Sequence, residues 1–269
     1  MPLATNQHAN DLADVLRSAL SAAGDDLLVV DPAAGTLSEL VSVATEFSGD
    51  LPVVRVVATE SVLKAATDDF RVASNAADLV EAGRLALRAD GTAENTLLVS
   101  RDAVLAVVSA GDRIAALSTD DREFVEAAFE TYRGHFEDAT AYQLRTPPLS
   151  RVRETLAAEV GEDALADFDA ALDALDDAPA VDEVTISLLV AAKNDVLLYD
   201  ISKWGENVGI ASKATFSRTK TRLEEAGLID TEKVPIDVGR PRLRLKLGEA
   251  APSDPRPAAL VDAVAEFEA

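Results

Sequence analysis

Residues 200–229 read DISKWGENVGIASKATFSRTKTRLEEAGLI, and this stretch constrains the fold more than any other part of the chain. Apolar side chains recur at helical spacing on both sides of Gly209, which predicts two helices joined by a short turn. Gly227 is expected to end the second helix, because glycine readily adopts the left-handed conformation that follows a helix end. The pattern therefore predicts two helices that meet at an angle, as in a helix-turn-helix unit.

The flanking residues extend this unit on both sides. Residues 184–195 predict a preceding helix, and residues 228–247 contain two strand-like runs joined by a turn at residues 239–241. Asp200 is a suitable N-cap for the middle helix. Helix, helix, turn, helix and hairpin is the order of a winged helix-turn-helix, whose third helix enters the major groove of DNA. We therefore expect an α+β domain at residues 184–248.

The charge distribution indicates the partner of this domain. The chain carries a net charge of −23, with 25 Lys and Arg against 48 Asp and Glu, yet residues 213–222 hold four basic side chains and no acidic one. Residues 184–248 as a whole contain eleven basic and eight acidic residues. A segment with a net positive charge in an otherwise acidic chain indicates a polyanionic partner, here double-stranded DNA. The alternatives are a solvated surface, or a winged helix used only for protein contacts.

Residue types in the third helix and the hairpin suit contacts with DNA. The first turns of such a helix face the base edges, where Arg218 can make two hydrogen bonds to a guanine. Lys220 and Arg222 lie further along and are expected to reach phosphates. The basic row of the second hairpin strand, at positions 242, 244 and 246, suits backbone phosphates or a minor groove. The predicted DNA-contacting residues are Ser212, Lys213, Thr215, Ser217, Arg218, Lys220, Arg222, Arg240, Arg242 and Arg244.

One position departs from the usual pattern of such a helix. The residue one turn after Phe216 is ordinarily apolar, but Thr219 and Lys220 are the candidates here. Either the third helix is held less tightly, or Lys220 lays its methylene stem over the core and its ammonium at the phosphates.

The N-terminal half predicts an α/β domain with a mixed sheet. Short apolar runs within residues 95–118 predict an antiparallel meander at a sheet edge. Helix 120–142 is expected to be capped by Asp120, with a core-facing stripe at Phe124, Ala128, Tyr132 and Phe136. The other expected elements are strands at 25–32 and 51–58 and helices at 11–23, 36–47, 59–66 and 73–89.

Proline-rich breaks divide the chain into segments. Two prolines in RTPPLS (145–150) stop a helix and stiffen a linker. The final helix carries Leu260, Val261, Val264 and Phe267 on one face, which packs within the chain or against a second subunit. The expected domains are an α/β regulatory or dimerisation domain at 1–145, a helical linker at 146–183, the winged helix-turn-helix at 184–248 and a C-terminal helix at 249–269.

Composition and absent motifs exclude several classes of protein. The chain has no cysteine, which excludes disulfides and thiolate chemistry. It has no phosphate-binding loop, dinucleotide fingerprint or metal-ligand cluster, so we expect no cofactor, no metal and no enzymatic activity. No run approaches the ~18 apolar residues of a membrane span, and the N-terminus lacks a secretory signal, which predicts a cytoplasmic protein. Abundant carboxylates with few lysines are typical of a haloarchaeal protein, the alternative being an acidic mesophilic one.

Three stretches resemble known families. DISKWGENVGIASKATFSRTKTRLEEAGLI with VGRPRLRLKL resembles the winged helix-turn-helix regulators of bacteria and archaea. LLVSRDAVLAVVSAGDRIAALSTDDREFVEAAFETYRGHF is similar to the sensor portions of archaeal TrmB-type regulators. The complete arrangement resembles the haloarchaeal TbsP-type transcriptional regulators. That resemblance implies control of central carbon metabolism genes through a small-molecule effector, a sugar or sugar phosphate.

Together these observations predict a homodimeric, sequence-specific DNA-binding transcriptional regulator with an N-terminal ligand-sensing or dimerisation domain. For an anionic effector, the candidate ligand-binding residues are Arg55, within a strand, and Arg101, at a strand end; the alternative is that both are surface arginines. Two other functions stay open: a scaffold that uses its winged helix for protein contacts, and an enzyme with an appended winged helix.

Overall fold

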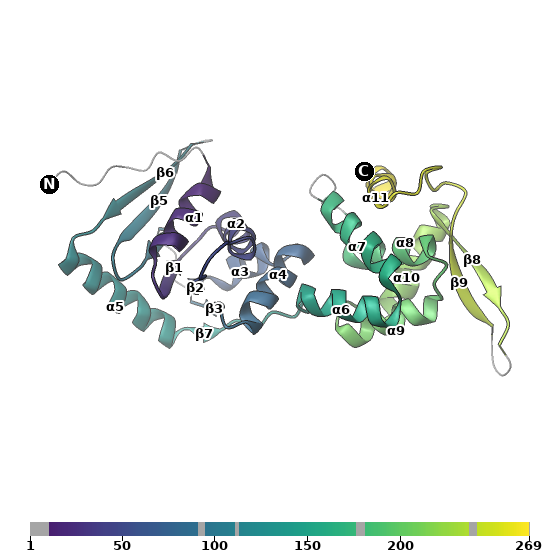
Figure 1. The fold of residues 1–269 in the computed structure, drawn as a ribbon, viewed down its shortest axis with the longest axis horizontal. Helices are drawn as coiled ribbons and strands as arrows, with labels where there is room; N and C mark the ends of the chain where they lie inside the picture. Colours follow the sequence, from purple (N-terminus) through teal and green to yellow (C-terminus); the bar gives the residue numbers. More distant parts are fainter. Residues whose placement is uncertain (1–10, 91–94, 111–112, 176–180, 237–240, 269) are drawn as a thin grey trace. The chain divides into compact units, whose positions relative to one another are not determined.

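The computed structural model describes residues 11–90, 95–110, 113–175, 181–236 and 241–268. The chain forms two compact units, Met1–Leu144 and Arg145–Ala269, so the division falls at the proline-rich stretch (Figure 1). Residues 146–183 and 249–269, treated above as a linker and a separate helix, lie in the second unit.

The first unit is an α/β domain built on a seven-stranded mixed sheet. The strand order is β6-β5-β4-β1-β2-β3-β7. Its elements are α1 (Leu12–Ala22), β1 (Asp26–Val30), α2 (Ala34–Thr45), β2 (Val53–Ala58), α3 (Glu60–Ala66), α4 (Phe70–Glu81), β3 (Leu85–Ala89), β4 (Leu97–Val99), β5 (Val104–Ala110), β6 (Arg113–Thr119), α5 (Arg122–Asp138) and β7 (Thr140–Ala141).

The sheet combines a parallel centre with antiparallel edges. Strands β1, β2 and β3 pair in parallel, with Val29 beside Val56 and Val56 beside Leu87. Strands β4, β5 and β6 form the antiparallel meander expected from residues 95–118 and end at the β6 edge. The short β7, which the sequence did not predict, pairs antiparallel with β3 at the opposite edge.

Alternating side chains of the strands pack into two separate hydrophobic cores, one on each face of the sheet. Leu27 and Val29 pack on the face that α1, α2, α3 and α4 cover, whereas Leu28 and Val30 pack toward α5 (Figure 1). Successive strand residues point to opposite faces, so the four apolar side chains of residues 27–30 are buried on the two sides in turn. This burial explains why β1 reads as a continuous apolar stretch rather than an alternating one.

Three sequence expectations in this unit were wrong. The helix expected at 73–89 ends at Glu81, and residues 85–89 form β3, because Gly83 has a left-handed φ of 68° that stops the helix. Asp121, not Asp120, caps α5 by accepting a hydrogen bond from the Phe124 backbone N–H at 2.9 Å. The third is Phe124, whose side chain is 55% exposed; the other members of the predicted stripe do face the core, since Phe136 is buried and Ala128 and Tyr132 pack against it, and Val125 and Phe129 complete this face.

The second unit surrounds a helix, α8, whose residues 184–192 are all buried. The hairpin β8–β9 is a separate two-stranded antiparallel sheet. The elements of the unit are α6 (Leu149–Glu159), α7 (Glu162–Ala174), α8 (Glu183–Lys193), α9 (Leu198–Val208), α10 (Lys213–Glu225), β8 (Ile229–Val234), β9 (Arg242–Leu247) and α11 (Pro257–Glu268).

Trp204 joins the first helices of this unit to the helix-turn-helix. Its indole is fully buried, meets the Phe168 ring edge-on at 6.4 Å between centroids, and donates a 3.0 Å hydrogen bond to the Thr155 hydroxyl. A buried indole N–H needs such an acceptor, because an unpaired one costs free energy. Helices α6 and α7 are therefore part of the core that holds α9.

The last helix, α11, packs within the chain. It lies against α7 and α8, and Leu260, Val261 and Val264 are buried there. Phe267, the fourth member of the predicted apolar face, is 53% exposed. Of the two alternatives open for this face, intramolecular packing accounts for three of its four side chains.

Candidate nucleic-acid interface

Helices α9 and α10 meet at a close contact that requires glycine. A Cβ added at Gly205 would lie 2.3 Å from the Phe216 ring, which is fully buried between the two helices. Gly209 follows α9 with a left-handed φ of 98°, and the Ile210 N–H donates to the Gly205 carbonyl at 2.9 Å. Asp200, expected to cap α9, lies in its first turn instead, and Leu197 holds the N-cap position.

The outward face of α10 lies opposite its buried stripe. Phe216, Thr219 and Leu223 are buried, so Thr219 occupies the position where an apolar residue was expected. The exposed residues of α10 on the side opposite that stripe are Ala214, Ser217, Arg218, Thr221 and, in the last turn, Glu225. Ala214 and Thr221 were not predicted, although a helical wheel centred on Phe216 and Leu223 would have found them. The start of the helix is capped by Ser212, whose hydroxyl accepts from the Thr215 N–H at 3.2 Å.

Arg218 is the cation of this outward face. Its side chain is exposed, and its guanidinium donates to the Thr215 hydroxyl at 3.4 Å. Within the part of the chain that the structure describes, no carboxylate lies within ion-pair distance of it. A guanidinium in this state can bond to a base edge or a phosphate without first leaving an acidic partner.

Lys213, at the first turn of α10, is paired with an acid from α9. Its ammonium lies 2.7 Å from the Glu206 carboxylate, and both side chains are about half exposed. The hydrogen bond from Lys213 lowers the pKa of Glu206, and the same bond raises the pKa of Lys213. Both groups are therefore charged at neutral pH, and a phosphate at this position has to compete with Glu206.

Lys220 points away from the outward face, and Arg222 is exposed but bonded to a neighbouring helix. The Lys220 side chain is only 13% exposed, and its ammonium lies 2.6 Å from Glu224, whose other oxygen accepts from Thr231 on β8 at 2.9 Å. Arg222 donates to the Thr185 hydroxyl on α8 at 3.0 Å. Both cations therefore brace α10 against its neighbours, and a phosphate contact by Lys220 would require it to leave Glu224.

The second hairpin strand presents the expected basic row, and each member of the row that the structure describes faces an acid. Arg242 lies 3.7 Å from Asp200, and Arg244 lies 3.9 Å from Glu232. The ammonium of Lys246 lies 2.7 Å from Asp195. Arg240, which was also predicted to contact DNA, lies outside the described residues.

The wing is joined to the helix-turn-helix through its backbone. Leu197 forms an isolated antiparallel bridge with Arg244, and the Leu245 N–H donates to the Val196 carbonyl at 2.9 Å. The residues between α8 and α9 thus continue the two-stranded sheet. This connection holds β9 beside the start of α9, where Arg242 stacks 4.5 Å from the centre of the Tyr199 ring.

Tyr199 and Lys203 are exposed residues that the sequence analysis missed. They lie on α9 at the spacing i and i+4, and Glu206 continues the same row at i+7. That helical spacing is the signal that could have revealed them. The described residues include no group of three or more histidine or acidic side chains able to hold a metal ion.

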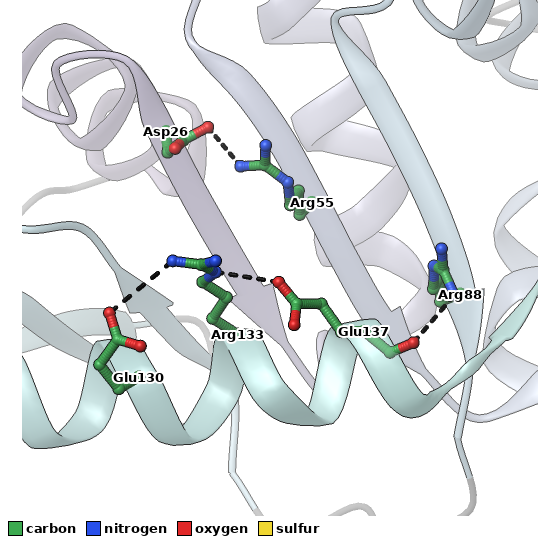
Figure 2. Close-up of polar contacts among 6 residues, drawn as sticks. All are labelled: Asp26, Arg55, Arg88, Glu130, Arg133 and Glu137. Atoms are coloured by element: carbon green, nitrogen blue, oxygen red, sulfur yellow. Dashed lines mark hydrogen bonds and ion pairs between the residues drawn. The ribbon is translucent and has the colours of Figure 1, made fainter.

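A second candidate site lies in the first unit, where residues of α5, β1 and β2 line a polar hollow of about 340 Å³. The structure brings the predicted ligand residues Arg55 and Arg101 to this hollow. Arg55 donates to Asp26 on the neighbouring strand, so it is already paired (Figure 2). Arg101 stacks over Phe129 at 4.5 Å from the ring centre, and none of the described carboxylates pairs with it.

Two further arginines near this hollow were not predicted. Arg133 bonds to Glu137 at 3.0 Å and lies 3.9 Å from Glu130, and the Glu137 bond raises the pKa of Arg133 (Figure 2). Arg88 on β3 donates to the backbone carbonyl of Glu137 at 3.3 Å. The site therefore alternates guanidinium and carboxylate groups. It offers donors to an anion and acceptors to hydroxyl groups.

The helix pair, its outward-facing second helix and the attached hairpin define a winged helix-turn-helix protein. The chain belongs to the TbsP-like transcriptional regulators. Residues 4–147 match the family described as "Transcriptional regulator TbsP-like, N-terminal", and residues 148–265 match "Transcriptional regulator TbsP-like, C-terminal HTH domain". The family resemblance inferred from the sequence and the expected fold class are thereby confirmed.

The search of curated proteins found no significant match. Among solved structures, the chain is similar to TrmBL2, described as an archaeal chromatin protein with a novel mode of DNA binding, at 12% identity and a TM-score of 0.38. The match covers 51% of this chain and about half, 52%, of TrmBL2. None of the described helices is long and apolar enough to cross a membrane.

Proposed function

We propose that this transcriptional regulator binds a specific double-stranded DNA sequence by inserting α10 into the major groove. The observation that supports this most is the outward face of the first turns of α10, which carries small side chains and Arg218, a residue with no acidic partner among those the structure describes. Small residues let the helix approach the base edges, and Arg218 reads a guanine there. Ser212, Lys213, Thr215 and Ser217 surround it in the first turns.

The wing supplies the second part of the proposed interface. Arg240, Arg242 and Arg244 contact the sugar–phosphate backbone, which sets the register of the protein on the duplex. Lys220 and Arg222 contribute by holding α10 in place. A homodimer would place two such units on half-sites about one helical turn apart.

A charge-reversal experiment tests this proposal. Arg218→Glu should abolish specific binding to the DNA upstream of the protein's own gene, measured by fluorescence anisotropy, without lowering the melting temperature. Arg256→Glu is the matched control, because Arg256 is exposed, lies in the same unit and is distant in sequence from α10. Operator affinity equal to wild type in Arg218→Glu would refute the proposed interface and would favour the scaffold alternative.

We further propose that the hollow in the first unit binds an anionic effector, a sugar phosphate or a sugar, and that the regulated genes are metabolic. Arg101 would hold the anion, Arg55 would assist it, and the Asp26 and Glu137 carboxylates would accept hydroxyl protons. A phosphorylated sugar should raise the melting temperature of the wild type and have less effect on Arg101→Gln. Arg17→Gln, an exposed arginine on α1, is the control. No shift with any phosphorylated sugar would remove the effector proposal and leave the DNA proposal untouched.

The cellular setting completes the proposal. We propose a haloarchaeal host and a cytoplasmic location, because the acidic composition suits concentrated salt and the DNA lies in the cytoplasm. A regulatory role without catalysis agrees with the family. Chromatin immunoprecipitation of the tagged protein would identify its target genes, and peaks confined to genes outside metabolism would contradict the metabolic part.

A further inference from the structure

One aromatic side chain of the second unit lies outside the core of its domain. Tyr199, in the first turn of α9, is 46% exposed, whereas Ile201 and Trp204 of the same helix are fully buried. Core packing therefore does not account for the tyrosine ring, and its contacts have to be sought at the surface.

The ring of Tyr199 lies under an arginine of the wing. The guanidinium of Arg242 is 4.5 Å from the ring centre. Leu197 pairs antiparallel with Arg244, and two residues further along each chain come Tyr199 and Arg242. The stack therefore follows from the backbone pairing that joins the wing to the start of α9.

This stack differs from the two others that the described residues form. Arg88 lies over Phe136 and Arg101 over Phe129, and both of those rings are buried in the first unit. The Tyr199 ring is exposed instead, and the Arg242 side chain is 41% exposed. An anion in solution can therefore reach the guanidinium of this pair.

Stacking leaves the N–H groups of Arg242 available to an anion. A guanidinium is planar, so one face can rest on a ring while the N–H groups at its edge bind a carboxylate or a phosphate. Asp200 lies 3.7 Å from Arg242, and its side chain is 43% exposed. Because such an exposed ion pair is weak, a phosphate can replace Asp200 while the guanidinium stays on the ring.

The ring also reduces the entropy that Arg242 loses on binding. A flexible side chain loses conformational freedom when a ligand fixes it, and a side chain that is already held loses less. We propose that Tyr199 is a positioning residue of the DNA interface, whose ring face holds Arg242 in the orientation that binds a backbone phosphate. The inference rests on the proposed function and assigns the role to the ring, not to the hydroxyl group.

Two substitutions at Tyr199 separate the ring from its hydroxyl group. Tyr199→Phe keeps the ring face and should bind DNA like the wild type. Tyr199→Leu removes the ring face and should weaken binding about two- to tenfold, measured by fluorescence anisotropy in potassium chloride. Equal weakening in both variants would mean that the hydroxyl contacts DNA and would overturn the proposal, as would wild-type affinity in Tyr199→Leu. Thermal melting checks that both variants fold.

A double-mutant cycle connects the ring to its arginine. Tyr199→Leu should have little further effect on DNA affinity in the Arg242→Ala background. It should keep its full effect in the Arg244→Ala background, which removes the neighbouring arginine of the same strand and serves as the matched control. Losses that simply add in the Arg242→Ala background would overturn the positioning role.

The cycle is measured on two duplexes, the DNA upstream of the protein's own gene and a scrambled sequence. A phosphate contact does not depend on sequence, so either duplex decides the role of Tyr199. Equal binding of both duplexes by the wild type would refute specific recognition by α10 while leaving the cycle interpretable. A wild-type protein that binds neither duplex would overturn both proposals.

Discussion

The recognition helix and the wing both carry basic side chains, but they hold them in different states. Arg218 on α10 has no acidic partner among the described residues, whereas Arg242, Arg244 and Lys246 on β9 each lie within 4.0 Å of a carboxylate. A count of charges in the sequence treats these residues alike. The cations of the wing must therefore break their ion pairs with carboxylates before they can pair with phosphates. Among the described residues, Arg218 has no such ion pair to break.

The exchange at the wing costs little. Ion pairs between exposed side chains contribute about 0–1 kcal/mol, so phosphates can replace the carboxylates. The displaced acids nevertheless remain near the DNA and repel it. We therefore expect the wing to contribute a small, sequence-independent part of the affinity, and α10 to contribute most of the discrimination between sequences.

The largest effect is expected from disrupting the contact between α9 and α10 at Gly205 and Phe216. Gly205→Ala would force a methyl group into the Phe216 ring, which should destabilise the second unit by about 1–3 kcal/mol and displace α10. Operator binding and the melting temperature should fall together. Gly134→Ala on α5 is the control, because nothing lies within 4 Å of its added Cβ, and it should leave DNA binding unchanged.

Truncating one arginine in each region tests the comparison directly. Arg218→Ala should remove about 1–3 kcal/mol of the preference for the operator over scrambled DNA. Arg242→Ala should weaken binding to both DNAs by the same small factor. Anisotropy titrations with both duplexes measure the two effects, and an equal loss of preference in the two variants would show that the wing also reads sequence.

Removing the charge of Glu206 tests how much an acidic partner limits the contribution of a basic residue to DNA binding. Glu206→Gln frees Lys213 from its partner and removes a repelling charge, so DNA affinity should increase a few-fold. Because the pKa of Glu206 is lowered, its carboxylate stays charged through neutral pH, and the gain should be the same at about pH 6 and about pH 8. A gain that disappears on going to the lower pH would contradict the assigned pair.

The smallest effect on DNA binding is expected at Lys220. Its ammonium is held by Glu224, so Lys220→Met should change operator affinity less than about twofold while leaving one carboxylate without its partner. Thermal melting should show a modest destabilisation. A large, salt-dependent loss of affinity instead would mean that Lys220 reaches a phosphate, as its sequence position suggested.

Local signals in the sequence were sufficient for the order of elements in the helix-turn-helix. Gly209 and Gly227 both have the positive φ expected of residues that follow helices, and Phe216 and Leu223 are buried as their spacing predicted. Such features depend on a residue and its near neighbours along the chain. The meander of β4, β5 and β6 was readable for the same reason.

Packing between distant segments decided the rest. LALRA at residues 85–89 became a strand because it lies beside β2, although its residues also suit a helix. The partner of Lys246 is Asp195, 51 positions away, and the partner of Arg55 is Asp26 on another strand. Which cations are free to meet DNA depends on the side of each element that the core leaves exposed. Local sequence preferences do not determine which side of a helix or strand is exposed, because tertiary packing decides that.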